Sequence, residues 1–276
     1  MNTLVKRTLS GLVFLAIMVG GLLFNQYSFA VLMLLILIVS MIEFYQMTMQ
    51  DRFGISRSWA IISSVFLFCL AFGVCAFGWP GKVLGLAFVP VLLVMIGSLY
   101  TKDHADFGAF ANLYTGILYI AFPLVLTNFA AFNAEHAYSG RLMLSFFIII
   151  WSSDVGAYCF GMALGQKYGK KLFPSISPKK SWVGAVGGFV MTVLAAWLLS
   201  VIGWMDIPWY HALALGAVMD VFGVYGDLFE SQWKRHYNVK DSGNSIPGHG
   251  GFLDRFDSAL FAIPAGVIYL SLFGLL

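Results

Sequence analysis

Charged residues are scarce in this sequence. They make up 11% of its 276 residues, against roughly 25% in ordinary soluble domains, and no polar stretch is long enough to form a soluble domain. Hydrophobic residues reach 60% instead, in runs of about 20 residues, the length that crosses a bilayer as a helix. The composition therefore excludes an ordinary soluble protein and predicts a single integral membrane domain over residues 1–276.

Cysteine pairs and nucleophile patterns are missing as well. Cys69, Cys75 and Cys159 lie in apolar runs without a CxxC spacing, which predicts buried thiols and argues against a disulfide framework or a cysteine metal site. Neither a serine–histidine–acid nor a thiol nucleophile constellation is evident. The sequence shows no convincing internal repeat, so an inverted-repeat transporter is not suggested.

Apolar runs bounded by polar, proline or glycine breaks predict the spans. In lipid the backbone must satisfy its own hydrogen bonds, so runs of this length are helices rather than barrel strands. The first run follows Lys6 and Arg7 like a signal peptide, but no small-residue cleavage site precedes a soluble protein, which favours a span. We predict an all-α polytopic membrane protein of about nine transmembrane helices, near 8–24, 28–49, 59–78, 82–100, 109–132, 142–165, 181–203, 209–229 and 256–275.

Lysine and arginine positions predict the orientation, because positive residues gather on the cytoplasmic side. With the amino terminus inside, fourteen of the sixteen basic residues are cytoplasmic, and only Lys82 and Arg141 lie outside. The prediction is a protein integral to the cell (inner) membrane, with the polar loop 229–255 in the cytoplasm, the carboxy terminus outside and the polar cavity facing the cytoplasm.

Carboxylates inside the predicted spans are the first sign of a site. Asp154 and Asp220 lie mid-span, and Asp227 lies near a cytoplasmic end. A charge at the helix centre costs roughly 2.5–3.5 kcal/mol on insertion scales, so such residues usually face a wet cavity or a partner. Glu43 obeys the same rule but stands alone, and a structural hydrogen bond to a neighbouring helix explains it as well as a function does.

The eighth span gains a polar face if its helix continues past the membrane. Asp220, Asp227 and Lys234 recur at seven-residue intervals, and Glu230 and Ser231 fall on the same side. An ordinary ion pair at an exposed helix end explains Glu230 and Lys234 but not Asp220.

The loop after that helix is the most informative segment. Asp254 and Asp257 stand at helical i, i+3 spacing at the start of the predicted last span. Carboxylates so placed can share Mg²⁺, which prefers oxygen ligands and bridges to phosphates. Gly248, Gly250 and Gly251 permit close backbone approach to a ligand. A simple turn would also explain them, but the acidic and basic neighbours favour a binding loop.

A second basic element precedes the seventh span. Ser181 is placed to cap a helix that begins just after Lys179 and Lys180, which makes a good anion site. A membrane-surface anchor for lipid head groups explains the two lysines equally well when they are taken alone. Carboxylates for a metal and basic groups for phosphates, in a membrane setting, point to metal-assisted phosphoryl or nucleotidyl transfer to a lipid.

Residues 231–257 resemble the signature of the phosphatidate cytidylyltransferase (CDP-diacylglycerol synthase) family. Residues 154–158 and 177–182 resemble two further motifs of that family, in the expected order, although Val155 and Val183 depart from its pattern. The signature match comprises Ser231, Lys234, Arg235, Lys240, Asp241, Gly243, Pro247, His249, Gly250, Gly251, Asp254, Arg255 and Asp257.

The resemblance implies that CTP and phosphatidate give CDP-diacylglycerol and pyrophosphate with Mg²⁺, with room for a second cation. It places the catalytic spans and loops in 141–276, after amino-terminal spans in 1–140. Metal binding is assigned to Asp227, Asp254 and Asp257. The catalytic set is Asp227, Asp254, Lys234, Lys240 and Asp241, and the substrate-binding set is Lys179, Lys180, Ser181, Ser231, Arg235, His249, Gly250, Gly251 and Arg255.

Two other functions stay open at this point. A CTP-dependent lipid-alcohol kinase would use similar groups, and an ion-coupled transporter would explain Asp154 and Asp220 at mid-membrane depth. Expected partners are CTP, phosphatidate and membrane lipids, without nucleic acid. The four-residue spacing of Gly161 with Gly165, and of Gly184 with Gly188, allows close helix packing within one chain or in a homodimer.

Overall fold

The computed structural model describes residues 3–50, 52–100, 107–165, 170–246 and 250–276. The chain forms two compact units. The amino-terminal unit comprises Met1–Gly140 together with Asp241–Arg255, and the carboxy-terminal unit comprises Arg141–Lys240 together with Phe256–Leu276. The boundary at Gly140 falls where the catalytic half was predicted to begin, but Asp241–Arg255 groups with the amino-terminal helices. The single membrane domain stays a prediction.

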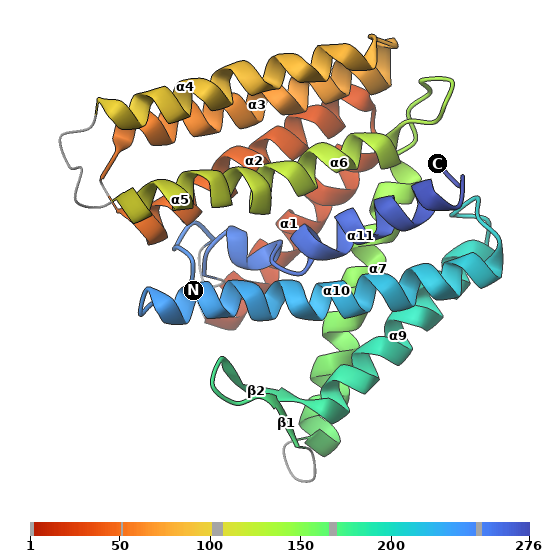
Figure 1. Ribbon diagram of the computed structural model, residues 1–276. Coiled ribbons are helices and arrows are strands. Elements are labelled where there is room, and N and C mark those ends of the chain that lie inside the picture. Colours follow the sequence, from red (N-terminus) through yellow and green to blue (C-terminus); the bar gives the residue numbers. More distant parts are fainter. Residues whose placement is uncertain (1–2, 51, 101–106, 166–169, 247–249) are drawn as a thin grey trace. The chain divides into compact units, whose positions relative to one another are not determined.

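The amino-terminal unit is a helical bundle built around α2 and α3. Helix α2 packs against α1, α3 and α5, while α3 packs against α4 and α6 (Figure 1). Its helices are α1 (Thr3–Leu23), α2 (Gln26–Met49), α3 (Gly54–Phe77), the 3₁₀ segment η1 (Gly81–Ala87) leading into α4 (Phe88–Leu99), and α5 (Phe107–Gly116) leading through the π-helical segment η3 (Ile117–Ala121) into α6 (Phe122–Ala131).

A capping box fixes the start of α2. The Asn25 side chain accepts hydrogen bonds from the amides of Tyr27 and Ser28, and the Ser28 hydroxyl accepts one from the Asn25 amide. These contacts satisfy amides that have no partner inside the helix. Buried residues follow along α2, from Phe29 through Ile36 to Tyr45, so the helix is packed along its length.

The carboxy-terminal unit combines long helices with one short hairpin. Helix α10 packs against both α9 and α11 (Figure 1), and β1 pairs with β2 in antiparallel fashion. The elements are α7 (Gly140–Phe160) continuing as the π-helical segment η4 (Gly161–Gly165), β1 (Lys171–Phe173), β2 (Ser177–Ser181), α9 (Trp182–Val201), α10 (Trp209–His236) and α11 (Ala259–Leu272).

Glycines on α9 let its backbone approach α7. A Cβ at Gly184 would lie 3.0 Å from the Ala157 carbonyl oxygen, and one at Gly188 would lie 3.0 Å from the Ser153 carbonyl oxygen. Gly161 on η4 faces Gly184, since a Cβ there would be 3.7 Å from the Gly184 Cα. The glycine spacing therefore serves packing within this chain. The homodimer stays a prediction, and the glycine spacing no longer supports it.

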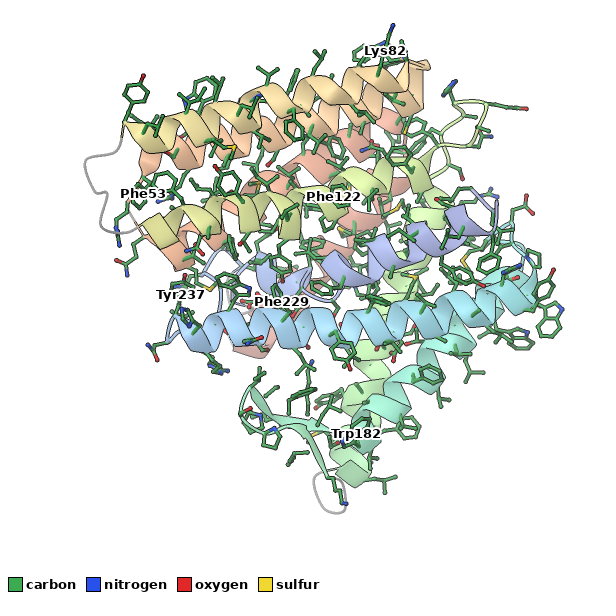
Figure 2. All side chains as sticks on the ribbon, viewed as in Figure 1. Phe53, Lys82, Phe122, Trp182, Phe229 and Tyr237 are labelled. Carbon is green, nitrogen blue, oxygen red and sulfur yellow. The ribbon has the colours of Figure 1, made fainter. Side chains whose placement is uncertain are left out.

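The helices confirm an all-α polytopic membrane protein. Within the described residues, six helical segments are long and apolar enough to span a bilayer, and three shorter apolar helices accompany them. Large apolar side chains point outward from both units, as Phe122 on α6 and Trp182 on α9 show (Figure 2). Lipid tails cover such side chains without the cost that water would impose.

One local feature was missed and one local prediction was wrong. The hairpin of β1 and β2 was not predicted, because strands of three and five residues are too short to show an alternating pattern. Asp254 and Asp257 do not begin the last helix, since α11 starts at Ala259. Asp254 lies in the 3₁₀ turn η5 (Leu253–Arg255), where its carboxylate bonds to loop amides instead of leading a helix.

Candidate active site

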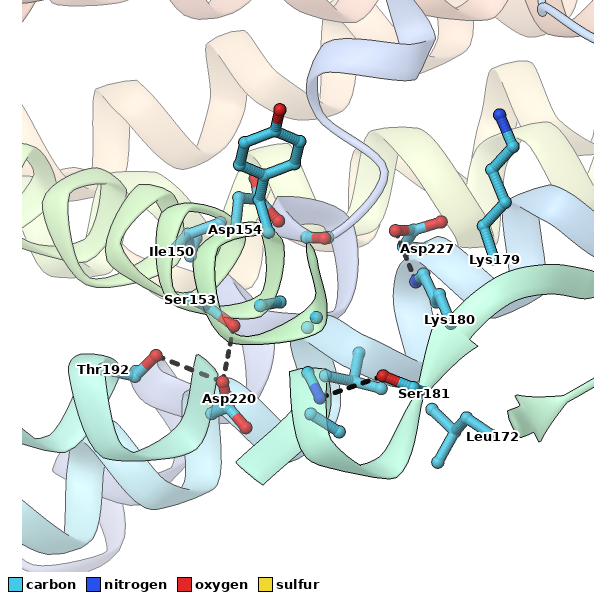
Figure 3. Close-up of a pocket in the computed structure, with 18 of the residues that line it drawn as sticks. Ile150, Ser153, Asp154, Leu172, Lys179, Lys180, Ser181, Thr192, Asp220 and Asp227 are labelled. Atoms are coloured by element: carbon cyan, nitrogen blue, oxygen red, sulfur yellow. Dashed lines mark hydrogen bonds and ion pairs between the residues drawn. The ribbon is translucent and has the colours of Figure 1, made fainter. Parts of the chain in front are cut away.

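A cavity of about 400 Å³ opens inside the carboxy-terminal unit. Its walls come from α7, β2, α9 and α10, and they combine apolar side chains with a polar group of residues (Figure 3). The polar lining consists of Ser153, Asp154, Tyr158, Lys179, Lys180, Ser181, Thr192, Asp220, Asp227 and Ser258. The sequence had singled out most of these residues separately, and the fold brings them to one cavity.

Lys180 and Asp227 form the central ion pair of this cavity. The Lys180 amino group lies 2.5 Å from Asp227 Oδ2, and each side chain is 27% exposed. Lys179 lines the same cavity, but its amino group points away from the pair (Figure 3). The hairpin explains the placement of both lysines, since they lie on β2, the strand that leads directly into α9. A solvent-accessible lysine beside a carboxylate provides both charges that a metal–phosphate complex needs.

Ser181 caps α9 as predicted. Its hydroxyl oxygen accepts a hydrogen bond of 3.1 Å from the Gly184 amide, and its backbone is extended, with φ −123° and ψ 154°. The amides of the first helical turn and the neighbouring lysines are therefore held at the cavity wall. That combination favours an anion.

Asp220 joins three helices at the wall of the cavity. Its Oδ1 accepts hydrogen bonds from Ser153 Oγ on α7 at 2.5 Å and from Thr192 Oγ1 on α9 at 3.1 Å (Figure 3). The side chain is buried, and these hydroxyls explain how its charge is tolerated. Asp154, by contrast, is exposed and lines the cavity.

Helix α10 continues to His236, past the predicted end of the span near residue 229, so the condition for a polar face that includes Lys234 is met. Ser231 Oγ donates to Asp227 Oδ1 at 3.3 Å, and Lys234 Nζ lies 2.8 Å from Glu230 Oε2. The Glu230–Lys234 pair is buried. The interpretation of these two residues as an ion pair is therefore confirmed, but its expected exposure at the surface was wrong. Arg235 is exposed and donates to the Val239 carbonyl oxygen at 3.1 Å.

Carboxylates crowd together around Asp257. Burial raises the pKa of the Asp257 carboxyl well above its usual range, and the negative charges of Asp227, Glu230 and Asp154 raise it further. Gly226 permits the close approach of α10 to the backbone at Asp257, because a Cβ at Gly226 would lie 2.6 Å from the Asp257 carbonyl oxygen. A cation would relieve this repulsion.

Residues Asp241–Arg255, the signature loop, belong to the amino-terminal unit. Asp254 braces the loop, since its Oδ2 accepts hydrogen bonds from the Ser242 amide at 3.0 Å and from the Gly251 amide at 2.9 Å. The Ile246 amide donates to the Gly250 carbonyl oxygen at 3.1 Å, and Gly250 has a φ of +83° that favours glycine. The described parts of the loop, 241–246 and 250–255, are therefore joined to each other by hydrogen bonds within the loop.

Glu43 is the residue whose role sequence reasoning left open. It is buried on α2, and its carboxylate accepts hydrogen bonds from the signature loop rather than from a neighbouring helix. The only signal in the sequence was a carboxylate within an apolar span. Its partners lie about 200 residues later in the chain, as the 199-residue separation from Ser242 shows.

The remaining predicted residues are placed as follows. Lys240, Asp241 and Arg255 are exposed, while His249 and Gly248 lie outside the described residues. Asp227 and Asp257 share the carboxy-terminal unit, whereas Asp254 belongs to the amino-terminal unit. The meeting of all three carboxylates around one cavity stays a prediction. In the part of the chain that the structure describes, no group of three or more His, Cys, Asp or Glu side chains is arranged to hold a metal ion.

Comparison with known proteins decides the family. The model of the cytidylyltransferase family matches residues 5–273, which is nearly the whole chain. The chain belongs to the cytidylyltransferase family. The cavity, the hairpin, the α10 face and the signature loop described above are thus parts of a cytidylyltransferase.

Curated relatives of this cytidylyltransferase carry the name phosphatidate cytidylyltransferase. The Bacillus subtilis protein is 38% identical over 180 residues, which is 65% of this chain and 63% of that protein. The Staphylococcus epidermidis protein is 30% identical over 255 residues, or 92% of each chain. The Rickettsia bellii protein is 37% identical over 185 residues, or 65% of this chain and 78% of that protein.

Proposed function

We propose that this cytidylyltransferase transfers the cytidylyl group of CTP to phosphatidate, forming CDP-diacylglycerol and pyrophosphate for phospholipid biosynthesis. The observation that carries the proposal is the Lys180–Asp227 pair in a cavity walled by membrane helices. Phosphate-binding and carboxylate groups meet there beside an apolar lining that suits a lipid. The names of the curated relatives agree with this reaction.

The reaction needs little covalent help from the protein. A phosphatidate oxygen attacks the α-phosphorus of CTP, a new P–O bond forms, and the bond to the bridging oxygen breaks with its electrons leaving on pyrophosphate. The attacking phosphate is already an anion, so no strong general base is required. The barrier lies in bringing two anions together, and fixed positive charges lower it. Lys180 and Lys179 on the hairpin would bind phosphate oxygens, with the capped start of α9 beside them.

The carboxylates fit Mg²⁺ by chemistry. Mg²⁺ commonly takes one or two protein carboxylates and completes its octahedron with substrate phosphates and water, so a group of three protein ligands is not required. Asp227 and Asp257 repel each other in the carboxy-terminal unit, and Asp254 is the third expected ligand, with room for a second cation. When bound, the ion would neutralise charge on the transferring phosphates.

Other family-signature residues receive supporting roles in this proposal. Ser231 would hold Asp227, while Lys234 is bound to Glu230 and shapes the α10 face. Gly250 and Gly251 would let the loop backbone approach the nucleotide. Further candidates for phosphate and nucleotide contacts are Arg235, Lys240, Asp241, His249 and Arg255.

CTP must reach the site from the cytoplasm, so we propose that the signature loop faces that side. In a variant whose three cysteines are replaced, Glu135→Cys is expected to react with a membrane-impermeant maleimide added outside, whereas Asn244→Cys is not. Both positions are exposed in the structure, which makes them a matched pair. Labelling of Asn244→Cys from outside in sealed cells would reject this orientation and the route for CTP.

A product assay tests the proposed reaction against the alternatives. Purified protein is incubated with labelled CTP, Mg²⁺ and phosphatidate, and the lipid product is identified. CDP-lipid with pyrophosphate is expected. Phospholipid with CDP, formed when a lipid alcohol replaces phosphatidate, would identify a kinase instead. Solute movement in sealed vesicles without CTP consumption would identify a transporter, although the hydroxyls that hold Asp220 remove part of the reason for that alternative.

A further inference from the structure

We propose that Glu43 is a positioning residue of the active site, which holds the signature loop, and with it Asp254, in its working shape. The inference rests on the proposed function only in treating this loop as part of the active site. It assigns a role in the reaction to α2, a helix that contains none of the three sequence motifs at 154–158, 177–182 and 231–257.

The contacts of Glu43 join the two ends of the loop. Glu43 Oε2 accepts from Ser242 Oγ at 3.0 Å and from the Leu253 amide at 2.8 Å. Glu43 Oε1 accepts from Ser245 Oγ and from the Phe252 amide, the latter at 2.9 Å. Donors converge on both oxygens, the pattern that an ionised carboxylate satisfies because it only accepts. Hydrogen bonds to a charged acceptor are the strong kind.

The position of Asp254 depends on the hydrogen bonds of Glu43 through two loop residues, Ser242 and Leu253. Ser242 gives its hydroxyl to Glu43 and its amide to Asp254, and the Leu253 amide bound by Glu43 belongs to the residue just before Asp254. A shift of the loop away from α2 therefore moves the Asp254 carboxylate. Catalytic geometry is sensitive to shifts of that kind, and about 1 Å is enough to cost about 100-fold in rate.

Glycines let the loop lie directly on the carboxylate. A Cβ at Gly243 would be 2.7 Å from Glu43 Oε1, and one at Gly251 would be 2.8 Å from Glu43 Oε2. Both distances are too short for a real carbon. The Glu43 carboxylate therefore lies directly against Gly243 and Gly251, and a Cβ at either position would require the carboxylate to move.

The test is Glu43→Gln, which keeps the size of the side chain but replaces one accepting oxygen with a donating NH₂. A backbone amide of the loop then loses its acceptor. We expect kcat/KM for CTP to fall about 100-fold, and amide hydrogen exchange to rise within 241–255 while α2 keeps its protection. Thr48→Val is the matched control, because Thr48 is buried on the same helix and its hydroxyl donates, among the residues that the structure describes, only to the Phe44 carbonyl oxygen. It should leave both measurements near the wild-type values.

Either of two results would overturn the proposal: wild-type turnover and exchange in folded Glu43→Gln, or exchange that rises equally in all helices. If Glu43→Gln does not fold, Ser242→Ala with Ser245→Ala removes two donors without touching the carboxylate, and the loop amides alone should exchange faster. Unchanged exchange in that double variant would also overturn it. The exchange measurement does not depend on activity, so a wild-type protein that makes no CDP-lipid would reject the proposed function and still leave the brace tested.

Discussion

Asp227→Asn is expected to lower Mg²⁺-dependent pyrophosphate release by about 100- to 1,000-fold, the range seen when one preorganised electrostatic group is removed from an active site. The substitution keeps the size of the side chain and one oxygen acceptor. It removes the charge that pairs with Lys180 at 2.5 Å and that contributes to the repulsion at Asp257. Ser231 Oγ can still donate to the remaining oxygen, so the fold of α10 should survive.

Two comparisons separate the metal assignment from the loss of an ion pair. Lys180→Met breaks the same pair but leaves the carboxylate, so it should raise the KM for substrates more than it changes the Mg²⁺ dependence. Lys82→Ala, on the exposed η1 segment, should be nearly silent. The measurement is pyrophosphate release by monodisperse protein over a range of Mg²⁺ concentrations. Near-normal release by Asp227→Asn would remove Asp227 from the metal site, even with the family membership unchanged.

Asp254→Asn should lose turnover to a similar extent, about 100- to 1,000-fold, while the signature loop keeps its shape. Asp254 Oδ2 accepts from two backbone amides, and the carbonyl oxygen of asparagine can accept from both in the same place. Asp254→Ala removes charge and acceptor together. Both variants should therefore be inactive, but only Asp254→Ala should expose the amides of Ser242 and Gly251 to faster hydrogen exchange.

The pair of substitutions distinguishes two roles of one carboxylate. Activity in Asp254→Asn close to wild type would show that the loop brace is its whole contribution and that the charge is not needed for a metal. Fast exchange in both variants would show instead that the charge itself holds the loop. Asp257→Asn belongs to the same series, and its turnover, measured at saturating Mg²⁺, should be strongly reduced.

Local signals in the sequence predicted the helices well. Hydrophobic runs long enough to cross a bilayer show each span directly, and the hydroxyl of Ser181 before an apolar run identifies a helix start, as the bond to Gly184 confirms. The seven-residue interval from Asp220 to Asp227 placed both on one face of α10, and both line the cavity. These features depend on residues close together in the chain.

Long-range contacts were not predictable in the same way. Nothing near Glu43 in the sequence names Ser242 or Leu253 as its partners, because pairing across 199 and 210 residues depends on the whole fold. The start of α11 was misplaced for a related reason. The helical spacing of Asp254 and Asp257 suggested a first turn, but loop amides compete for the Asp254 carboxylate and hold it in η5.

The membership of Asp241–Arg255 in the amino-terminal unit has a consequence for biosynthesis. A ribosome releases Glu43 long before the serines and amides that will bind it, so the buried carboxylate enters the membrane without these partners. The cost of a charge within a span is then offset only when the last part of the chain emerges. The contact between Glu43 and Ser242 joins residues 199 positions apart in the chain, and contacts of such long range form slowly compared with a helix. The first helices to be inserted are thus completed among the last, and a chain truncated before residue 241 lacks the loop donors that Glu43 binds in the full protein.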